Sequence, residues 1–216
     1  MLMGSRRNTK LMSQGSYVQI DLNAREITYT FQLVAIDLQE TNLTNLFARK
    51  NNKTLAQTIE HRRYLHLATR VREQYADMLD EPIGRSLLRL KTSGDPFYLR
   101  FLNTHGDKTY CRFSIDGFRE EKGVYAWFAG QQLRYIGRSL DSFSKRVNQG
   151  YGIISPKNCF LDGQSTNCHL NSLIASSVQD ISLFVCPIES EQEICEVERD
   201  LILQYQPQWN TVLVAR

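Results

Sequence analysis

The stretch Gly123-Val-Tyr-Ala-Trp-Phe-Ala-Gly-Gln-Gln-Leu-Arg-Tyr-Ile-Gly137 decides how the second part of the chain folds. Its β-branched and aromatic residues predict two short strands, Gly123 to Phe128 and Leu133 to Ile136. The two strands are joined around Gly130, which is typical of a turn. We therefore expect a hairpin at the start of this part of the chain.

Three helices and one further strand are predicted after this hairpin, from periodicity and from cap residues. They are a helix over Asp141 to Gln149 capped by Asp141 or Ser142, a helix over Asn167 to Ser177, a strand over Ile181 to Val185, and a helix that the capping box Ser190-Glu-Gln-Glu193 opens and that ends near Tyr205. The order β-β-α-α-β-α predicts a small α/β domain with a three-stranded sheet and helices.

Glu198 is an anomaly within the last of these helices. At roughly 100° per residue it falls in the middle of an apolar arc. The arc consists of Ile194, Val197, Leu201, Ile202 and Tyr205, while Glu196, Arg199 and Asp200 point the other way. A carboxylate that faces the core must be paired, protonated or bound to a metal, because burying it bare is costly. The alternative is a partly exposed or salt-bridged glutamate at the edge of the arc.

Arg146 raises the same question on the first helix. It lies beside Phe143 and Val147, while Lys145 points outward. Arg146 and Glu198 are therefore either partners in a structural ion pair, or a phosphate clamp and a metal ligand in one active site.

These residues together resemble the GIY-YIG nucleases. The triplets Gly123-Val-Tyr125 and Tyr135-Ile-Gly137 are similar to the paired signature of that family, with a valine in the first triplet. Arg146 follows nine residues after Gly137, and the stretch from Glu198 to Tyr205-Gln-Pro-Gln-Trp-Asn210 is similar to a glutamate helix that ends in Pro-x-x-Asn. The resemblance covers about Gly123 to Val212 and is closest in style to the restriction endonucleases of the family.

The resemblance implies a role for each matched residue. Glu198 would bind a single divalent metal, usually Mg²⁺ with Mn²⁺ as a substitute, and Arg146 would steady the scissile phosphate. Tyr125 would assist attack by water, Tyr135 would position phosphate or water, and Asn210 would hold the site together by hydrogen bonds. Phosphodiester hydrolysis needs an activated nucleophile, neutralised nonbridging oxygens and a stabilised leaving oxygen, which these residue types can provide. A phenol with a pKa of about 10 is a weak base unless the metal or the arginine lowers that pKa.

The register of the hairpin tests these roles. Because strand side chains alternate between faces, Tyr125 and Tyr135 share a face only if they lie opposite one another or are offset by an even number of residues. That arrangement requires a three-residue loop, Ala129 to Gln131, or a bulge. A plain two-residue turn at Gly130-Gln131 would put Tyr135 on the wrong side.

One position departs from the family pattern. Many members carry His or Tyr four residues after the arginine, and this chain has Gly150 there. Tyr151 follows directly, and either substitutes through a different helix end or leaves the role vacant. This departure favours the alternative of a DNA-binding protein that keeps the scaffold and no longer cuts.

Residues 1–122 lie outside the resemblance and predict a separate α+β module. The patterns predict a flexible tail over residues 1–15, a hairpin of Tyr17 to Ile20 with Ile27 to Ala35, one helix from about Thr54 to Leu79, and a second hairpin of Phe97 to Leu102 with Thr109 to Ile115. The charged segment Asp116 to Lys122 marks the boundary. We therefore expect an N-terminal module over 16–122 and a catalytic domain over 123–216.

The helix over Thr54 to Leu79 has two faces of different chemistry. One is apolar and consists of Tyr64, Leu67, Ala68, Val71, Tyr75 and Met78; the opposite one is basic and consists of Arg62, Arg63, His66 and Arg70. The basic face is either the solvated back of a core helix or a surface that contacts DNA. Positions 1–122 carry 19 Lys and Arg against 14 Asp and Glu, and positions 123–216 carry 7 against 9. If DNA binds, the N-terminal part supplies most of the attraction.

Four residues of the second part are further candidates for contact with DNA: Arg138, Tyr151, Asn167 and His169. The segment Gln164 to Asn171 resembles a polar segment before the second helix in some family members, and the alternative is a helix cap with polar surface residues. His61 and His105 have no companion at the spacing of metal ligands, so we interpret both as surface residues.

Composition places the chain among soluble globular proteins. Hydrophobic residues make up 42% and charged residues 23% of the 216 residues. No run approaches the roughly 18 to 20 apolar residues of a membrane span, and Met1 to Gly15 has no apolar region of a signal peptide, so we expect a cytoplasmic protein without a membrane partner. The five cysteines are odd in number and never spaced as C-x-x-C, which favours reduced thiols.

The leading hypothesis is a Mg²⁺-dependent endonuclease that cuts double-stranded DNA to 5′-phosphate and 3′-hydroxyl ends, as a type II restriction endonuclease does. The alternatives are a repair or mobile-element nuclease of the same family, a non-cleaving DNA-binding protein on the same scaffold, and an interaction domain in which Arg146 and Glu198 form a structural ion pair. One active site per chain favours a homodimer or sequential cutting of the two strands.

Overall fold

The computed structural model describes residues 12–14 and 17–210 and has a mixed α/β fold. Its contacts divide the chain into two units, and the segments of the two units alternate along the sequence. The sheet unit consists of Met1–Asp37, Phe113–Gln149 and Ser177–Arg216. The helical unit consists of Leu38–Arg112 and Gly150–Ser176. This division differs from the predicted boundary between residues 122 and 123, because segments from both sides of that boundary contribute to each unit.

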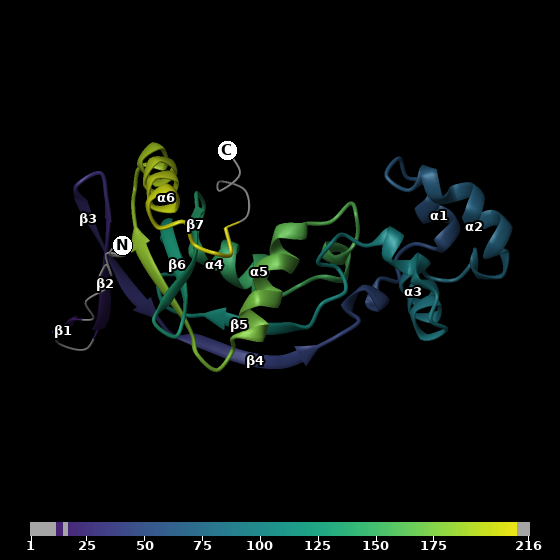
Figure 1. The fold of residues 1–216 in the computed structure, drawn as a ribbon, viewed down its shortest axis with the longest axis horizontal. Helices are drawn as coiled ribbons and strands as arrows, with labels where there is room; N and C mark the ends of the chain where they lie inside the picture. The colour runs from purple at the N-terminus through teal and green to yellow at the C-terminus, as the bar shows by residue number, and fades with distance from the viewer. Residues whose placement is uncertain (1–11, 15–16, 211–216) are drawn as a thin grey trace, which may run out of the picture. The chain divides into compact units, whose positions relative to one another are not determined.

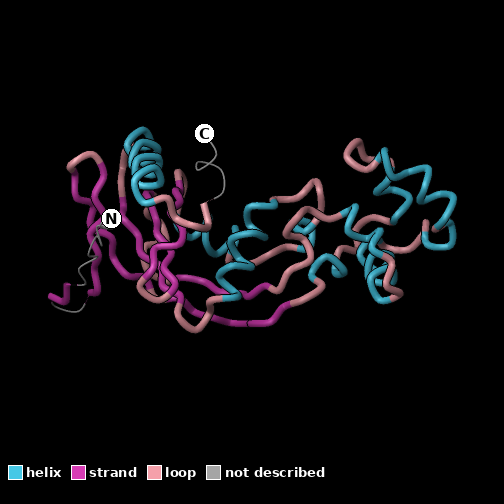
Figure 2. Tube along the Cα trace, viewed as in Figure 1, coloured by secondary structure: helices cyan, strands magenta, loops and turns pink. Residues whose placement is uncertain are grey.

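The sheet unit is built on six antiparallel strands in the order β1-β2-β3-β8-β6-β7 (Figure 1, Figure 2). These strands are β1 (Met12–Gln14), β2 (Tyr17–Ala24), β3 (Ile27–Val34), β6 (Gly123–Ala129), β7 (Gln132–Ser139) and β8 (Ile181–Pro187). The predicted three-stranded sheet corresponds to β6, β7 and β8. The sheet is larger than predicted because β3 pairs with β8, which joins the N-terminal hairpin to it.

The hairpin of β2 and β3 confirms the first prediction for the N-terminal region, with strands longer than expected. Its turn consists of Arg25 and Glu26, both with positive φ, which matches the twist of a two-residue hairpin loop. Ile20, Leu22 and Phe31 are buried and belong to the core of the sheet unit.

One face of the sheet is covered by α6 (Glu191–Tyr205), which lies across the strands in Figure 1. The hydroxyl of Ser190 accepts a hydrogen bond from the Glu193 amide and so caps the helix as predicted. The predicted apolar arc is buried, and Ile194, Val197, Leu201 and Ile202 share a core with Val124, Ala126 and Phe128 of β6.

A short helix, α4 (Phe143–Arg146), follows β7 and continues into a π-helical turn over Val147–Tyr151. Ser142 caps α4 by accepting a hydrogen bond from the Lys145 amide. Of the two predicted cap residues, Asp141 and Ser142, the second is therefore the correct one. Phe143 packs edge-on against Tyr125 of β6. Tyr125 and Phe143 therefore pack on the face of β6 opposite the residues that contact α6.

The helical unit contains four α-helices: α1 (Leu55–Ile59), α2 (Ala68–Gln74), α3 (Ile83–Thr92) and α5 (Ser165–Ser176). A separate two-stranded sheet consists of β4 (Ile36–Leu43) and β5 (Tyr110–Ile115). α5 was predicted as part of the catalytic domain, but it contributes Cys168 to the core of the helical unit. Asn171 of α5 also bonds to the amide and the carbonyl of Cys111 in β5, at 3.0 and 2.9 Å.

The single helix predicted over Thr54 to Leu79 is wrong: the segment is broken into α1, α2 and short 3-10 turns. α1 begins at a capping box of Thr54 and Gln57 and ends at Ile59. Tyr64 then donates a hydrogen bond of 2.6 Å to Asp162 and stacks on Phe101, and these tertiary contacts override the 3.6-residue periodicity. The apolar face itself is correct, since Tyr64, Leu67, Ala68, Val71 and Met78 are buried.

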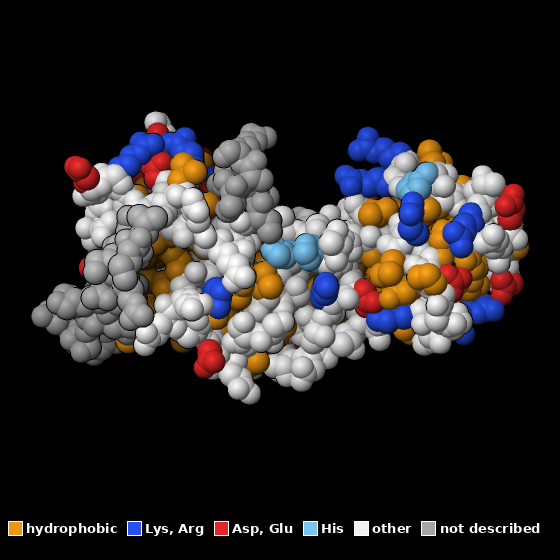
Figure 3. Space-filling view, in the orientation of Figure 1, with side chains coloured by type: hydrophobic (Ala, Val, Ile, Leu, Met, Phe, Trp, Pro, Cys, Tyr) orange, Lys and Arg blue, Asp and Glu red, His pale blue; other side chains and the backbone are white. Residues whose placement is uncertain are grey.

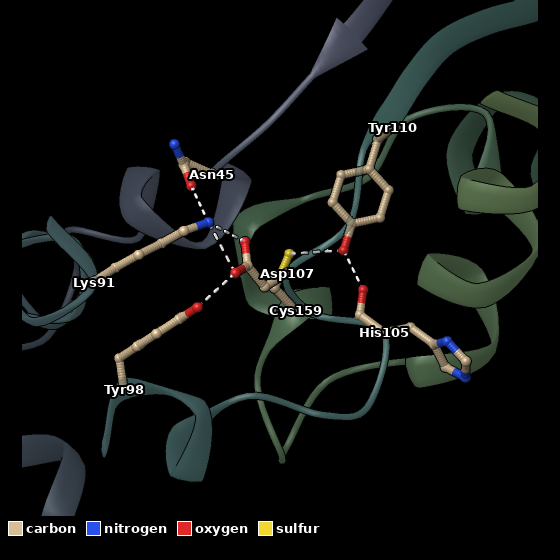
Figure 4. Close-up of polar contacts among 7 residues, drawn as sticks. All are labelled: Asn45, Lys91, Tyr98, His105, Asp107, Tyr110 and Cys159. Carbon is tan, nitrogen blue, oxygen red and sulfur yellow. Dashed lines mark hydrogen bonds and ion pairs between the residues drawn. The ribbon is translucent and has the colours of Figure 1, made fainter. Parts of the chain in front are cut away.

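The second predicted hairpin is also wrong. Residues 96–101 form a 3-10 helix, in which Pro96 occupies the first turn and Asp95 accepts a hydrogen bond from the Phe97 amide. β5 pairs instead with β4. The turn before β5 is fixed by Asp107, which binds Lys91 at 2.7 and 2.8 Å and accepts the Tyr98 hydroxyl at 2.8 Å (Figure 4).

Within the part of the chain that the structure describes, none of the helices is both long and apolar enough to cross a membrane.

Candidate active site

Tyr125 of β6 and Tyr135 of β7 lie on the same face of the sheet because of a β-bulge. The turn between the strands has two residues, since Ala129 pairs with Gln132. The register then shifts between Phe128 and Trp127, so that Tyr125 pairs with Gly137 and Tyr135 lies two residues away. The prediction that a bulge would align the two tyrosines is confirmed.

The two tyrosine rings stack next to Gly137, with their centroids 6.1 Å apart and an interplanar angle of 29°. A Cβ atom at Gly137 would lie 2.6 Å from the ring carbon Cζ and the hydroxyl oxygen of Tyr125, and 2.7 Å from Cε1 of Tyr135. The glycine of the second triplet is therefore required sterically, because a side chain there would displace both rings.

Arg146 approaches this pair from α4. Its Nε donates a hydrogen bond of 3.1 Å to the hydroxyl of Tyr125, which is fully buried. Lys145, by contrast, is exposed and pairs with Asp141 at 2.6 Å. The prediction that Arg146 turns inward and Lys145 outward is confirmed.

The Tyr135 hydroxyl holds its proton tightly. The neighbouring Tyr125 raises the pKa of Tyr135 most, burial and Glu198 raise it further, and Arg146 opposes them. Tyr135 therefore acts as a hydrogen-bond donor at neutral pH, which suits the positioning of a phosphate oxygen or a water molecule.

Glu198 lies on α6 with its side chain 13% exposed, and it forms an ion pair with Arg138 of β7. Burial raises the pKa of the Glu198 carboxyl, while the charges of Arg138 and Arg146 oppose that rise. The metal ligand stays a prediction, and the salt-bridged glutamate, which was the alternative, is confirmed for Glu198. Its partner was not foreseen, because Arg138 was expected only to contact DNA. Arg138 precedes Ser139 at the end of β7 and is 42% exposed, so it is the more accessible member of the pair.

Asn210 forms hydrogen bonds along the edge of β7. Its amide side chain accepts a hydrogen bond of 2.9 Å from the Ile136 amide and donates one of 2.7 Å to the Ile136 carbonyl, as a neighbouring strand would. The Trp209 amide bonds to the carbonyl of Arg134, the bulged residue, at 2.8 Å. Asn210 thus holds the strand that carries Tyr135, in agreement with its predicted role.

The remaining DNA candidates belong to the helical unit, where several have local partners. Tyr151 and Asn167 are buried, and Asn167 bonds to Gln164 at 2.6 Å, so we do not retain these two as DNA contacts. His169 is half-buried, and its ring centroid lies 4.4 Å from that of His105. The fold thus brings together two histidines that are distant in sequence, a pairing that the spacing of His105 in the sequence did not indicate.

The predicted basic face in the helical unit is exposed, and two of its arginines also hold neighbouring segments. Arg63 donates a hydrogen bond of 2.7 Å to the Leu161 carbonyl. Arg70 bonds to Gln74 at 2.8 Å and lies over the ring of Phe97 at 4.3 Å. Arg62 and His66 are exposed, and Figure 3 shows Lys and Arg side chains beside Asp and Glu side chains on the visible face over α1, α2 and α3.

Glu198 fits a Mg²⁺ ligand by its chemistry. It is a mostly buried carboxylate next to Arg138, a residue type suited to binding phosphate, and Mg²⁺ commonly takes one or two carboxylates together with water and substrate phosphates. Among the residues that the structure describes, no group of three or more His, Cys, Asp or Glu side chains could hold a metal. A metal at Glu198 would therefore draw further ligands from water and from the substrate.

Comparisons with protein-family models, with curated proteins and with solved structures found no match to this chain.

Proposed function

We propose that this chain is a metal-dependent endonuclease that hydrolyses DNA to 5′-phosphate and 3′-hydroxyl ends. The observation that carries the proposal is the alignment of Tyr125, Tyr135 and Arg146 on one face of the sheet, with Gly137 making room for both rings. The residues also match those that the resemblance to the GIY-YIG nucleases singles out.

Each residue of the site suits a part of phosphodiester hydrolysis. The Tyr125 hydroxyl accepts a hydrogen bond from the Nε of Arg146, and in its phenolate form it would accept a proton from an attacking water molecule. The Arg146 guanidinium can bind nonbridging phosphate oxygens, and the protonated Tyr135 hydroxyl can orient the phosphate or the water. Mg²⁺ held by Glu198 would stabilise the negative charge on the leaving 3′ oxygen.

The finer assignment is a type II restriction endonuclease that acts on double-stranded DNA in the cytoplasm, with the helical unit selecting the target. A homodimer would cut both strands at once. A repair or mobile-element nuclease of the same family has the same chemistry, and it differs in the DNA that it selects. Discrete plasmid fragments would support restriction, whereas a smear would argue against it.

A second candidate is a DNA-binding protein that no longer cuts. The observation that favours it is the ion pair of Arg138 with Glu198, because an arginine on the carboxylate competes with a metal. Gly150, where family members often carry His or Tyr, favours it as well.

Incubation of supercoiled plasmid with Mg²⁺ separates the two candidates. The wild type and the Glu196→Gln control, altered two residues earlier on α6, should nick and linearise the plasmid. The Glu198→Gln variant should fold and leave the plasmid intact. A wild type that is inert on several unmethylated DNAs while it still binds them would support the second candidate.

A further inference from the structure

Three cationic side chains converge on residues 157–162 of the helical unit. The Nζ of Lys50 lies 4.3 Å from the centroid of the Phe160 ring, and Lys50 is 8% exposed. Arg63 binds the Leu161 carbonyl at 2.7 Å. Lys157 belongs to the segment itself and is exposed. The surface over this segment is therefore rich in positive charge.

Asp162 is the carboxylate at the centre of this surface, and it already has a partner. It accepts the Tyr64 hydroxyl at 2.6 Å. Burial raises the pKa of the Asp162 carboxyl, but this hydrogen bond and the charges of Lys50 and Lys157 together bring the pKa below its ordinary value. Burial lowers the pKa of Lys50 most, the charge of Asp162 opposes this effect, and the charges of Lys53 and Lys157 lower the pKa further. Lys53 follows Lys50 by three residues along the chain, and it is a fourth, exposed cation.

We infer that Lys50, Lys53, Arg63 and Lys157, here called the lysine cluster, bind the phosphate backbone of the DNA on which the enzyme acts. The formal charges are four cations against the one carboxylate of Asp162. The choice of DNA as the polyanion rests on the proposed function.

The cluster differs from the other partly buried lysine of the unit, Lys91. The ammonium of Lys91 is matched by both oxygens of Asp107 and by Asn45, as Figure 4 shows. Lys50 instead has an aromatic ring beneath it, and the one carboxylate whose charge acts on it, Asp162, is accompanied by the opposing charges of Lys53 and Lys157. Lys91 therefore stabilises the fold, whereas the lysine cluster keeps excess charge at the surface, where it attracts a polyanion.

The members of the lysine cluster have two different roles. Lys50 and Arg63 hold residues 160 and 161, so their removal would disturb the fold. Lys53 and Lys157 are exposed and are the members that would reach phosphate oxygens.

Binding of a fluorescent DNA duplex, measured by anisotropy without divalent metal, tests the inference. The Glu198→Gln background prevents cutting, and the test variant adds Lys53→Glu and Lys157→Glu. The matched control adds Arg85→Glu and Lys108→Glu, two exposed residues of the same unit with the same change in charge. Arg85 lies on the face of α3 that also carries Leu88, Arg89 and Thr92.

The test variant should bind DNA about tenfold or more weakly than the control at moderate salt. The slope of log affinity against log salt should fall by about 1.8, because each phosphate contact contributes roughly 0.9. Equal losses in the test and control variants would overturn the inference, since they would reflect general charge alone. Loss of binding to anionic phosphatidylserine vesicles, with DNA binding unchanged, would overturn it as well.

The outcomes for the lysine cluster and for the nuclease are independent. Wild-type protein that never cuts but loses DNA binding with the lysine cluster would leave this inference standing and remove the proposed activity. A wild type that cuts would support the proposed activity. If the test and control variants then bound DNA equally well, the inference about the lysine cluster would fall. Unfolding in urea, measured for both variants, shows whether either change has disturbed the fold.

Discussion

The Nε of Arg146 lies 3.1 Å from the hydroxyl oxygen of Tyr125 and donates a hydrogen bond to it. The two residues come from α4 and β6, and they are 21 positions apart in the sequence. The contact places a permanent positive charge next to a buried phenol. A proposed role in activating water therefore depends on both partners.

Replacement of either partner should abolish most of the cleavage. Tyr125→Phe keeps the ring and removes the hydroxyl, and Arg146→Lys keeps a charge but loses the planar guanidinium that bonds to the phenol. Each should lower the single-turnover rate by roughly 10²- to 10⁴-fold, the usual contribution of a general base. Tyr29→Phe, on β3, is the control and should cut normally. Full activity of Tyr125→Phe would remove the tyrosine from the mechanism.

Gly137→Ala should destabilise the protein. The new Cβ would lie 2.6 Å from the Tyr125 ring, so one or both rings must move, at a cost of about 1 to 3 kcal/mol in the free energy of unfolding. Gly117→Ala is a matched control, because its Cβ would meet the side chain of Val34 at an ordinary 3.7 Å. Urea denaturation measures both. A neutral Gly137→Ala variant would show that the two rings are not packed as described.

Glu198 should make stability depend on pH in a defined direction. Burial raises the folded pKa of Glu198 above the ordinary 4.5, so the folded state binds this proton more tightly than the unfolded chain does. The contribution to stability is present below pH 4.5 and is lost as the pH rises through the folded pKa. Glu198→Gln, which mimics the protonated form, should therefore gain stability relative to the wild type as the pH rises across this window.

Urea denaturation at a series of pH values checks this difference, with Glu196→Gln as the control. A difference between wild type and Glu198→Gln that is flat, or that shrinks with rising pH, would contradict the raised pKa.

Arg138 should compete with a metal for Glu198. The Arg138→Gln variant removes the guanidinium from the carboxylate, so Mn²⁺ binding in the absence of DNA should tighten, by about tenfold or about 1.4 kcal/mol. Electron paramagnetic resonance measures free Mn²⁺ directly and requires no cleavage. Arg199→Gln, an exposed arginine one position after Glu198, should leave the affinity unchanged. Identical Mn²⁺ affinities in Arg138→Gln and wild type would show that Arg138 does not compete with the metal for Glu198.

Local patterns in the sequence were sufficient to predict much of the site. The alternation of β6 and β7 predicts that Tyr125 and Tyr135 need a bulge to share a face, and the structure contains one. The apolar arc of α6 predicts that Glu198 faces inward. Both signals arise from one or two neighbouring elements, where side-chain period alone decides which face is buried.

Contacts between distant segments could not be predicted in the same way. The pairing of β3 with β8 joins residues more than 140 positions apart, and nothing in either strand specifies its partner. For the same reason Asp200 was expected to face outward, yet it is 12% exposed because the hairpin brings Arg25 to within 2.9 Å. The same holds for the broken helix after Thr54 and for the pairing of Arg138 with Glu198. Both depend on contacts with distant residues, which a local sequence pattern does not predict.

The measurement that tests the central claim most directly is the single-turnover cleavage of an end-labelled duplex in the presence of Mg²⁺, with analysis of the product ends. The wild type and Glu196→Gln should cut at equal rates to give 5′-phosphate and 3′-hydroxyl ends. Folded Glu198→Gln should be slower by about 10²- to 10³-fold or more, since the charge on the leaving oxygen loses its stabilisation. Equal rates for Glu198→Gln and the wild type, or cleavage that persists without divalent metal, would contradict the proposed active site.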